Sequence, residues 1–287
     1  MTDKVVVTGG SGRLGQYVLS ELSTDYSVTN VDLVPGEIGV DLVRCDITDF
    51  EAVRAAVGGA RAVCHLAALD YDTHALPHEY MRVNALGSWN VMQAAAETGV
   101  KRVVLTSSVS AFGLFEDGAE RALPRYLPVD EAHPCQPVAP YGISKLLAEL
   151  AAERLAASYD IDVVCLRPLA VALRGSAARA RDWVAGRPEG WLHNYVAATD
   201  VARAFRCAIE VEIDGFALFN IGAADTGVSE PTLQWYADQV GPPPTIREPG
   251  LYSDHPRAAV FSSAAARAGL GWEPRVSLDD IGSIEPA

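Results

Sequence analysis

The sequence lacks a long uncharged apolar run. A bilayer-spanning helix needs roughly 20 consecutive apolar residues, and no stretch of the 287-residue chain reaches that length. The first four residues lead directly into a strand-like segment, so we expect no signal peptide. We therefore expect a cytoplasmic protein without a membrane partner.

Positive charge is also scarce. The chain has 23 Lys and Arg against 37 Asp and Glu, which gives a net charge of −14. Duplex binding needs clustered cations, so we expect no nucleic-acid partner. The hydrophobic fraction of 49% and the charged fraction of 21% are those of an ordinary globular protein. The length allows one large domain, or one domain with a small lobe.

Paired cysteines and metal-ligand spacings are missing as well. The five cysteines are an odd number and form no C-x-x-C pair. Cys45, Cys64 and Cys165 lie in apolar strand-like runs, where we expect buried free thiols and hence a reducing compartment. The six histidines show no spacing typical of metal ligands, and we predict no metal site.

The first two thirds of the chain alternate short β-branched runs with helical patterns. This rhythm predicts a doubly wound parallel sheet of the Rossmann type, with helices on both faces. Helical patterns include 78–99 and the segment that begins at Tyr141. The predicted strands are 4–10, 26–33, 41–47, 60–68, 101–108 and 161–168.

The rhythm changes after Pro168. We expect a Rossmann-type domain at 1–168, to which 195–222 return, and a small carboxyl-terminal substrate lobe at 169–194 and 223–287. The later segments are predicted as a helix at 199–210, a strand at 216–222, a proline-rich connector at 241–250 and a Ser-capped helix within 261–274.

A glycine loop follows the first strand. Gly9, Gly12 and Gly15 form G-x-x-G-x-x-G between a strand and a helix. Glycines there allow a tight turn and a close approach to a pyrophosphate, and the helix N-terminus supplies free N–H groups. The context predicts nucleotide binding in preference to a purely structural turn.

Two aspartates at strand ends are candidates for the adenosine end of a dinucleotide. Asp32 would accept hydrogen bonds from the ribose hydroxyls and repel a 2′-phosphate, which favours NAD over NADP. Its alternative is a turn residue, and Arg13 in the glycine loop would help to tolerate NADP. Asp46 would bind the adenine amino group, or else belong to the start of a helix.

Tyr141 and Lys145 are four residues apart and share one face of a predicted helix. Taken alone, Tyr141 and Lys145 are better explained as ordinary surface residues of a helix. Ser108 ends the fifth strand, at the edge where ligands bind in doubly wound folds. A hydroxyl, a phenol and an ammonium beside a dinucleotide form a proton-and-hydride site. On the same helix, we expect Leu147, Leu150, Ala151 and Leu155 to form a packing stripe.

With these features together, the chain resembles the extended short-chain dehydrogenase/reductase superfamily, in its NAD-dependent epimerase/dehydratase family. The resemblance covers nearly the whole chain, and its motifs occur in the family's order. They are TGGSGRLG, Asp32, CDIT, HLAA, Asn84, LTSSVSAFG, YGISK, LRP, TDVA, FNIG and LGWEP.

The resemblance implies roles for these positions. Tyr141 would be the acid/base, Lys145 would hold the nicotinamide ribose and lower the pKa of the phenol, and Ser108 would bind the same substrate oxygen. NAD is the implied cofactor. Helices near 78–98 and 141–157 would form a homodimer interface. Implied cofactor contacts are Gly9, Gly12, Arg13, Leu14, Gly15, Asp32, Asp46, Ile47, Leu66, Ala67, Ala68, Asn84 (alternatively a packing amide), Thr106, Tyr141, Lys145 and Pro168.

The chain departs from the family pattern between LRP and TDVA. This segment is short, N-x-Y-G-P is absent, and Phe112 replaces the usual tyrosine. We therefore expect a free sugar, sugar acid or similar polyol, as in short members such as uronate dehydrogenases. An arginine of the segment would clamp a carboxylate, or the loop is simply solvated. The residues concerned are Arg174, Arg179, Arg181 and His193, with Trp183 and Trp191 expected to pack.

Three functions remain at this point. The first is an NAD-dependent dehydrogenase. The second is a nucleotide-sugar 4-epimerase of the UDP-glucose 4-epimerase type, which removes a hydride and returns it to the opposite face. The third is a non-catalytic NAD sensor, which the intact Ser108, Tyr141 and Lys145 set disfavours.

Overall fold

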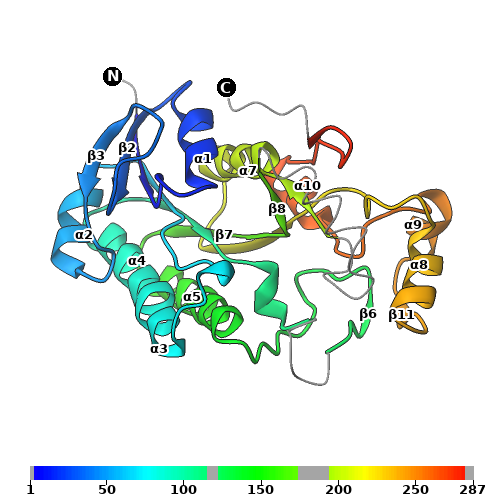
Figure 1. Cartoon of the computed structure of the whole chain (residues 1–287). Helices are drawn as coiled ribbons and strands as arrows, with labels where there is room; N and C mark the ends of the chain where they lie inside the picture. The colour runs from blue at the N-terminus through cyan, green and yellow to red at the C-terminus, as the bar shows by residue number, and fades with distance from the viewer. Residues whose placement is uncertain (1–2, 115–121, 174–193, 282–287) are drawn as a thin grey trace.

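A seven-stranded parallel sheet forms the centre of the molecule (Figure 1). The computed structural model describes residues 3–114, 122–173 and 194–281. The strand order is β10-β7-β5-β4-β1-β2-β3. The chain adds β2 and β3 on one side of β1 and then β4, β5, β7 and β10 on the other, which confirms the predicted doubly wound Rossmann-type fold. The strands are β1 (Lys4–Thr8), β2 (Ser27–Asp32), β3 (Asp41–Arg44), β4 (Ala62–His65), β5 (Arg102–Thr106), β7 (Asp162–Pro168) and β10 (Phe216–Ile221).

Helices cover both faces of the sheet, and alternate strand residues point to opposite faces. Val5 and Val7 pack in the core with α1 (Gly15–Leu22) and α7 (Ala198–Glu210). Val6 packs in the other core. Three helices line that second face: α2 (Phe50–Val57), α4 (Gly87–Glu97) and α5 (Pro140–Ala156).

The predicted helix at 78–99 is interrupted. It consists of α3 (Pro77–Tyr80), a π-helical turn at Met81–Leu86 and α4. The π turn inserts one residue into the helical repeat, and it places Asn84 inside the protein. Periodicity alone gave one continuous helix because the insertion leaves the apolar pattern on both sides intact.

The predicted packing stripe of α5 is partly wrong. Leu155 is buried and Ala151 packs against the core, as expected. Leu147 and Leu150, however, are 43% and 48% exposed. The buried face of α5 instead carries Lys145, Ala148, Glu149 and Ala152.

Smaller elements follow β5, β7 and β10. Figure 1 shows α8 and α9 at the opposite end of the molecule from α2 and β3. β6 pairs with β11, and β8 pairs with β9. The bounds are β6 (Tyr126–Leu127), β8 (Val171–Ala172), β9 (Val196–Ala197), α8 (Thr232–Gln239), β11 (Thr245–Ile246), α9 (Pro249–Asp254) and α10 (Ala264–Leu270), with short 3-10 turns at Tyr71–Thr73 and Val109–Phe112.

All five cysteines are free thiols, and Cys45, Cys64 and Cys165 are buried as predicted. Within the described ranges, no helix is long and apolar enough to cross a membrane. The same ranges hold no cluster of three or more His, Cys, Asp or Glu side chains arranged to bind a metal.

Candidate active site

The glycine loop joins β1 to α1 with no space for side chains at two of its glycines. Gly9 has φ +76°, and a Cβ there would lie 2.4 Å from the backbone nitrogen of Ala67. A Cβ on Gly15 would lie 2.2 Å from the carbonyl oxygen of Gly9. The loop, the start of α1 and the segment after β4 are therefore in close backbone contact. Gly12 is less constrained, with 3.2 Å to the same carbonyl.

The glycine loop offers free backbone N–H groups at the start of α1. Arg13 and Leu14 immediately precede α1, and among the described residues their N–H groups have no hydrogen-bond partner. Free N–H groups at the positive end of a helix dipole bind anions such as phosphate. The loop thus fits the pyrophosphate of a dinucleotide.

Asp32 ends β2 beside the glycine loop. Its carboxylate accepts hydrogen bonds from the backbone N–H of Ser11 at 3.0 Å and of Leu33 at 2.7 Å. These bonds fix the carboxylate at the edge of the loop, where it would meet the adenosine ribose. Arg13 points elsewhere, because it pairs with Asp70 and lies 3.7 Å from Asp72. The argument that Arg13 would tolerate NADP therefore loses support.

We predict that Asp32→Asn lowers the preference for NAD over NADP by at least about tenfold, since placing like charges together costs several kcal/mol. The measurement is the ratio of dissociation constants for the two nucleotides. Asp41→Asn, which removes an exposed carboxylate on β3, is the matched control. An unchanged ratio in Asp32→Asn would remove Asp32 from the cofactor site.

Asp46 and Ile47 lie beyond the end of β3. One carboxylate oxygen of Asp46 accepts bonds from the backbone N–H and hydroxyl of Thr48, at 2.9 and 2.8 Å. This supports the role in starting the helix, although Asp49 is the actual N-cap of α2. Ile47 is buried, and its carbonyl accepts from Asn90 at 3.0 Å. An adenine contact by Asp46 or Ile47 stays a prediction.

The segment after β4 faces the glycine loop. Leu66, Ala67 and Ala68 are half-buried there, and the N–H of Leu66 binds the carbonyl of Thr8 at 2.9 Å. Asn84 holds this segment through hydrogen bonds to its backbone. Its amide binds both backbone groups of Leu69, at 2.7 and 3.0 Å, and the Ser144 hydroxyl at 3.1 Å. Asn84 is therefore a packing amide, and its direct contact with a cofactor stays a prediction.

Tyr141 and Lys145 start α5 at the edge where β5 ends. The Lys145 ammonium lies 5.7 Å from the centre of the Tyr141 ring and donates to the carbonyl of Thr106 at 3.0 Å. Ser108 follows β5 and caps the next turn by accepting from the N–H of Ser110 at 3.1 Å. The hydroxyl of Thr106 is buried without a hydrogen-bond partner among the described residues. An unused donor at this edge fits a bound ligand.

The surroundings of Tyr141 and Lys145 shift the pKa values of both side chains. Burial lowers the pKa of Lys145 to about 8, so it remains mostly protonated at neutral pH. Burial raises the pKa of Tyr141 above its usual value, the Asp70 carboxylate raises it further, and a hydrogen bond from Ser108 opposes the rise. The Lys145 ammonium and a second cation bound beside the phenol would therefore both be needed to bring the pKa of Tyr141 into the working range.

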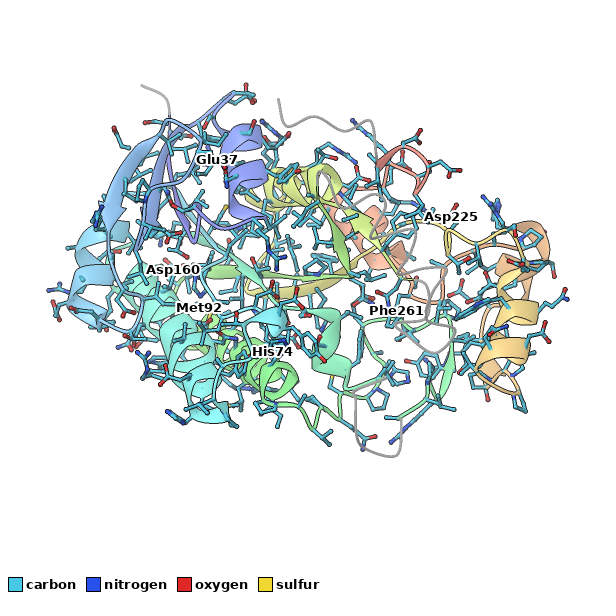
Figure 2. The ribbon with its side chains drawn as sticks, viewed as in Figure 1. Glu37, His74, Met92, Asp160, Asp225 and Phe261 are labelled. Atoms are coloured by element: carbon cyan, nitrogen blue, oxygen red, sulfur yellow. The ribbon has the colours of Figure 1, made fainter. Side chains whose placement is uncertain are left out.

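Two tyrosines after β4, Tyr71 and Tyr80, contact Tyr141, and the sequence did not indicate them. The rings of Tyr71 and Tyr80 meet the Tyr141 ring edge-on, with centroids 6.1 and 6.0 Å away. Tyr71 begins a 3-10 turn (Tyr71–Thr73) that is followed by His74, labelled in Figure 2, with φ +49°. Asp70 caps this turn through the N–H of Tyr71 at 2.7 Å. Their proximity to the HLAA motif is the only sequence signal for these two tyrosines.

Pro168 ends β7 and is buried beside Ile221 of β10. Phe112, in place of the usual tyrosine, is buried against His133 and Phe261. Several candidate substrate residues lie outside the described residues. They are Arg174, Arg179, Arg181, Trp183, Trp191 and His193.

Known proteins are similar to this chain in sequence and fold. A UDP-glucose 4-epimerase from Corynebacterium glutamicum is 25% identical over 94% of this chain and 91% of its own length. An NAD-dependent glucose-6-phosphate dehydrogenase from Haloferax volcanii is 28% identical over 78% and 87%. The crystal structure of a Brucella ovis UDP-glucose 4-epimerase with NAD superposes with a TM-score of 0.74, at 25% identity, over 98% of this chain and 96% of the other.

The family assignment follows from the sequence match and the fold together. Residues 5–188 match the NAD dependent epimerase/dehydratase family. NAD is accordingly the cofactor, and the chain is an NAD-dependent enzyme of the dehydrogenase or epimerase kind. The protein belongs to the NAD-dependent epimerase/dehydratase family.

Proposed function

We propose that the protein is a dehydrogenase that oxidises a secondary hydroxyl of a sugar, sugar acid or similar polyol. The observation that carries this proposal is the convergence of Ser108, Tyr141 and Lys145 beside the glycine loop, at the carboxyl edge of the sheet. A proton acceptor there is next to the site of hydride transfer.

In this proposal each side chain has one task. The Tyr141 phenolate takes the proton of the substrate hydroxyl, and the Ser108 hydroxyl binds the same oxygen. The Lys145 ammonium, held by the Thr106 carbonyl at 3.0 Å, stabilises the phenolate. NAD, when bound, accepts the hydride from the substrate carbon. The edge-on rings of Tyr71 and Tyr80 restrict the orientation of the phenol.

The short segment between β7 and α7 supports a small substrate. Only residues 169–197 separate these elements, which leaves little protein to enclose a nucleotide. The Haloferax relative, a dehydrogenase of a sugar phosphate, matches over most of its own length. The second candidate is a UDP-glucose 4-epimerase-like activity, which the similarity to two such epimerases favours.

One assay separates the two functions. The experiment measures NADH formed per substrate consumed, across free sugars, sugar acids and UDP-sugars. One NADH for each free sugar or sugar acid consumed would establish the dehydrogenase. An isomer formed without net NADH would establish the epimerase. Exclusive use of UDP-sugars would contradict the small-substrate proposal.

We also propose that the enzyme is a homodimer through α4 and α5, which lie side by side in Figure 1. Four apolar side chains on this face are exposed: Leu86 50%, Trp89 37%, Leu147 43% and Leu150 48%. Neighbouring exposed apolar residues mark contact surfaces. The five free thiols suit assembly in a reducing compartment.

Replacing Leu147 and Leu150 by glutamate should convert this dimer to a monomer, because the interface would then bury unpaired carboxylates. The measurement is the mass in solution by light scattering. Leu123→Glu alters another exposed leucine outside both helices and should leave the mass unchanged. A wild-type protein that is already monomeric would refute the proposed interface.

A further inference from the structure

Three buried polar side chains form a network next to the proposed catalytic residues Ser108, Tyr141 and Lys145. They come from three separate elements: Ser107 follows β5, Glu149 is on α5 and Arg167 is on β7. The Glu149 carboxylate accepts from Arg167 Nε at 2.7 Å and from Nη2 at 2.6 Å. The Ser107 hydroxyl donates to the same carboxylate. Sheet and helix are therefore tied together by charged hydrogen bonds inside the protein.

Arg167 makes two further contacts, with an aromatic ring and with a thiol. Its guanidinium stacks on the Phe112 ring at 4.4 Å, and Nη2 lies 3.3 Å from the Cys135 sulfur. A buried ion pair is weak evidence for stability, because desolvating both charges offsets their attraction. Apolar side chains of similar volume would hold β5, β7 and α5 together equally well. The charged network therefore calls for a role other than packing.

Each member of the network adjoins a residue of the proposed active site. Ser107 lies between Thr106, whose carbonyl binds Lys145, and Ser108. Glu149 is one helical turn beyond Lys145 and two turns beyond Tyr141. Arg167 precedes Pro168 at the end of β7. A shift of any one member would move a neighbouring catalytic or cofactor-facing group.

We propose that Ser107, Glu149 and Arg167 are positioning residues, which fix the end of β5 against α5 so that Ser108, Tyr141 and Lys145 keep their alignment. This inference rests on the proposed function for the identity of the catalytic groups. The network itself touches neither substrate nor cofactor.

The network also contributes to the charge balance around Lys145. Burial favours the neutral amine, whereas the Asp70 and Glu149 carboxylates favour the ammonium. Buried His65 stays neutral, since its pKa is lowered to about 3 by burial and by Lys145. Neutralising Glu149 would leave the Arg167 guanidinium uncompensated nearby. Lys145 would then lose its proton at a lower pH.

The test uses Glu149→Gln, which keeps the size of the side chain and removes its charge. The chain contains three lysines, Lys4, Lys101 and Lys145, so 13C-lysine labelling gives three NMR signals that can be titrated separately. Burial lowers the pKa of Lys145 to about 8, and we expect its titration midpoint to be lower in Glu149→Gln than in the wild type, while the Lys4 and Lys101 midpoints stay unchanged.

Kinetics supply the second readout. Glu149→Gln should lower kcat by about tenfold to a hundredfold, as expected for a small displacement of catalytic groups, and the alkaline limb of kcat/KM should move to lower pH. Ser107→Ala removes one hydrogen bond and no charge. It should lower kcat by about tenfold with little change in NAD binding, and it provides the test if Glu149→Gln fails to fold.

Asp162→Asn is the matched control. Asp162 pairs with Arg102 at 3.2 Å across β7 and β5, the same two strands, but at their amino ends. It should lower thermal stability without moving the Lys145 midpoint or the pH profile. A folded Glu149→Gln with the wild-type Lys145 midpoint and wild-type kcat would overturn the inference. A shifted midpoint in an enzyme that oxidises no substrate would instead refute the proposed function and leave the network standing.

Discussion

Replacing Tyr141 by phenylalanine should lower kcat by about a hundredfold to ten-thousandfold, the range for loss of a general acid–base group. The variant keeps the ring, whose edge-on contacts with Tyr71 and Tyr80 position it, and loses only the hydroxyl. NAD binding should therefore change little. The measurement combines single-turnover NADH formation with an NAD titration of the same preparation.

The pH dependence provides a more specific signature of the phenol. Burial and the Asp70 carboxylate raise the pKa of Tyr141 and keep it protonated, whereas the charge of the Lys145 ammonium, 5.7 Å from the ring centre, favours ionisation of the phenol. Below the Lys145 pKa of about 8, oxidation by the wild type should accelerate as pH rises, because a growing fraction of the phenol is ionised. Above that pH the rate should fall, because the ammonium that stabilises the phenolate is lost. The residual rate of Tyr141→Phe should lack this dependence on pH.

Tyr159→Phe is the control for the lost hydroxyl. Tyr159 follows α5 and is 40% exposed. Its neighbour Asp160 pairs with Lys101 just before β5, so Tyr159 lies at the amino end of that strand, away from Ser108. This variant should keep the wild-type rate. If Tyr141→Phe also keeps it on every substrate found, another group moves the proton and the proposed mechanism is wrong.

The sheet was predictable because local sequence determines it. Runs such as Val5–Val7 are continuously apolar, as required of strands covered on both faces. The glycine loop was predictable for a similar reason, since the demands on Gly9 and Gly15 arise within a few residues of backbone. Ser108, Tyr141 and Lys145 followed from strand and helix ends that a doubly wound sheet brings to one edge.

The parts that were not predicted depend on contacts between distant segments. Ser107, Glu149 and Arg167 have unrelated sequence surroundings, and only the pairing of β5 with β7 beneath α5 brings them together. The direction of Arg13 similarly depends on Asp70 in another loop. The exposure of Leu147 and Leu150 was missed because an apolar stripe looks the same whether it faces the chain's own core or a second molecule.

Replacing Gly9 by alanine should weaken NAD binding by at least about tenfold, or about 1.4 kcal/mol. The new methyl group would lie 2.4 Å from the Ala67 nitrogen, so the segment after β4 must move away from the glycine loop. That movement changes the groove in which we place the pyrophosphate. Calorimetric titration with NAD measures the effect.

Gly59→Ala separates this effect from backbone strain. Both glycines adopt left-handed backbone angles, φ +76° at Gly9 and φ +72° at Gly59, but a Cβ on Gly59 meets nothing within 4 Å. The conformational cost of roughly 1–2 kcal/mol is therefore common to both variants. Only Gly9→Ala also displaces the cofactor groove.

Thermal unfolding with and without NAD then distinguishes the two causes. A ligand at 100 times its dissociation constant stabilises a protein by about 2.7 kcal/mol. Wild type and Gly59→Ala should gain the same increase in Tm from a fixed NAD concentration, although Gly59→Ala starts lower. Gly9→Ala should start lower and gain less. An equal gain in all three would show that the contact between Gly9 and Ala67 does not shape the NAD site.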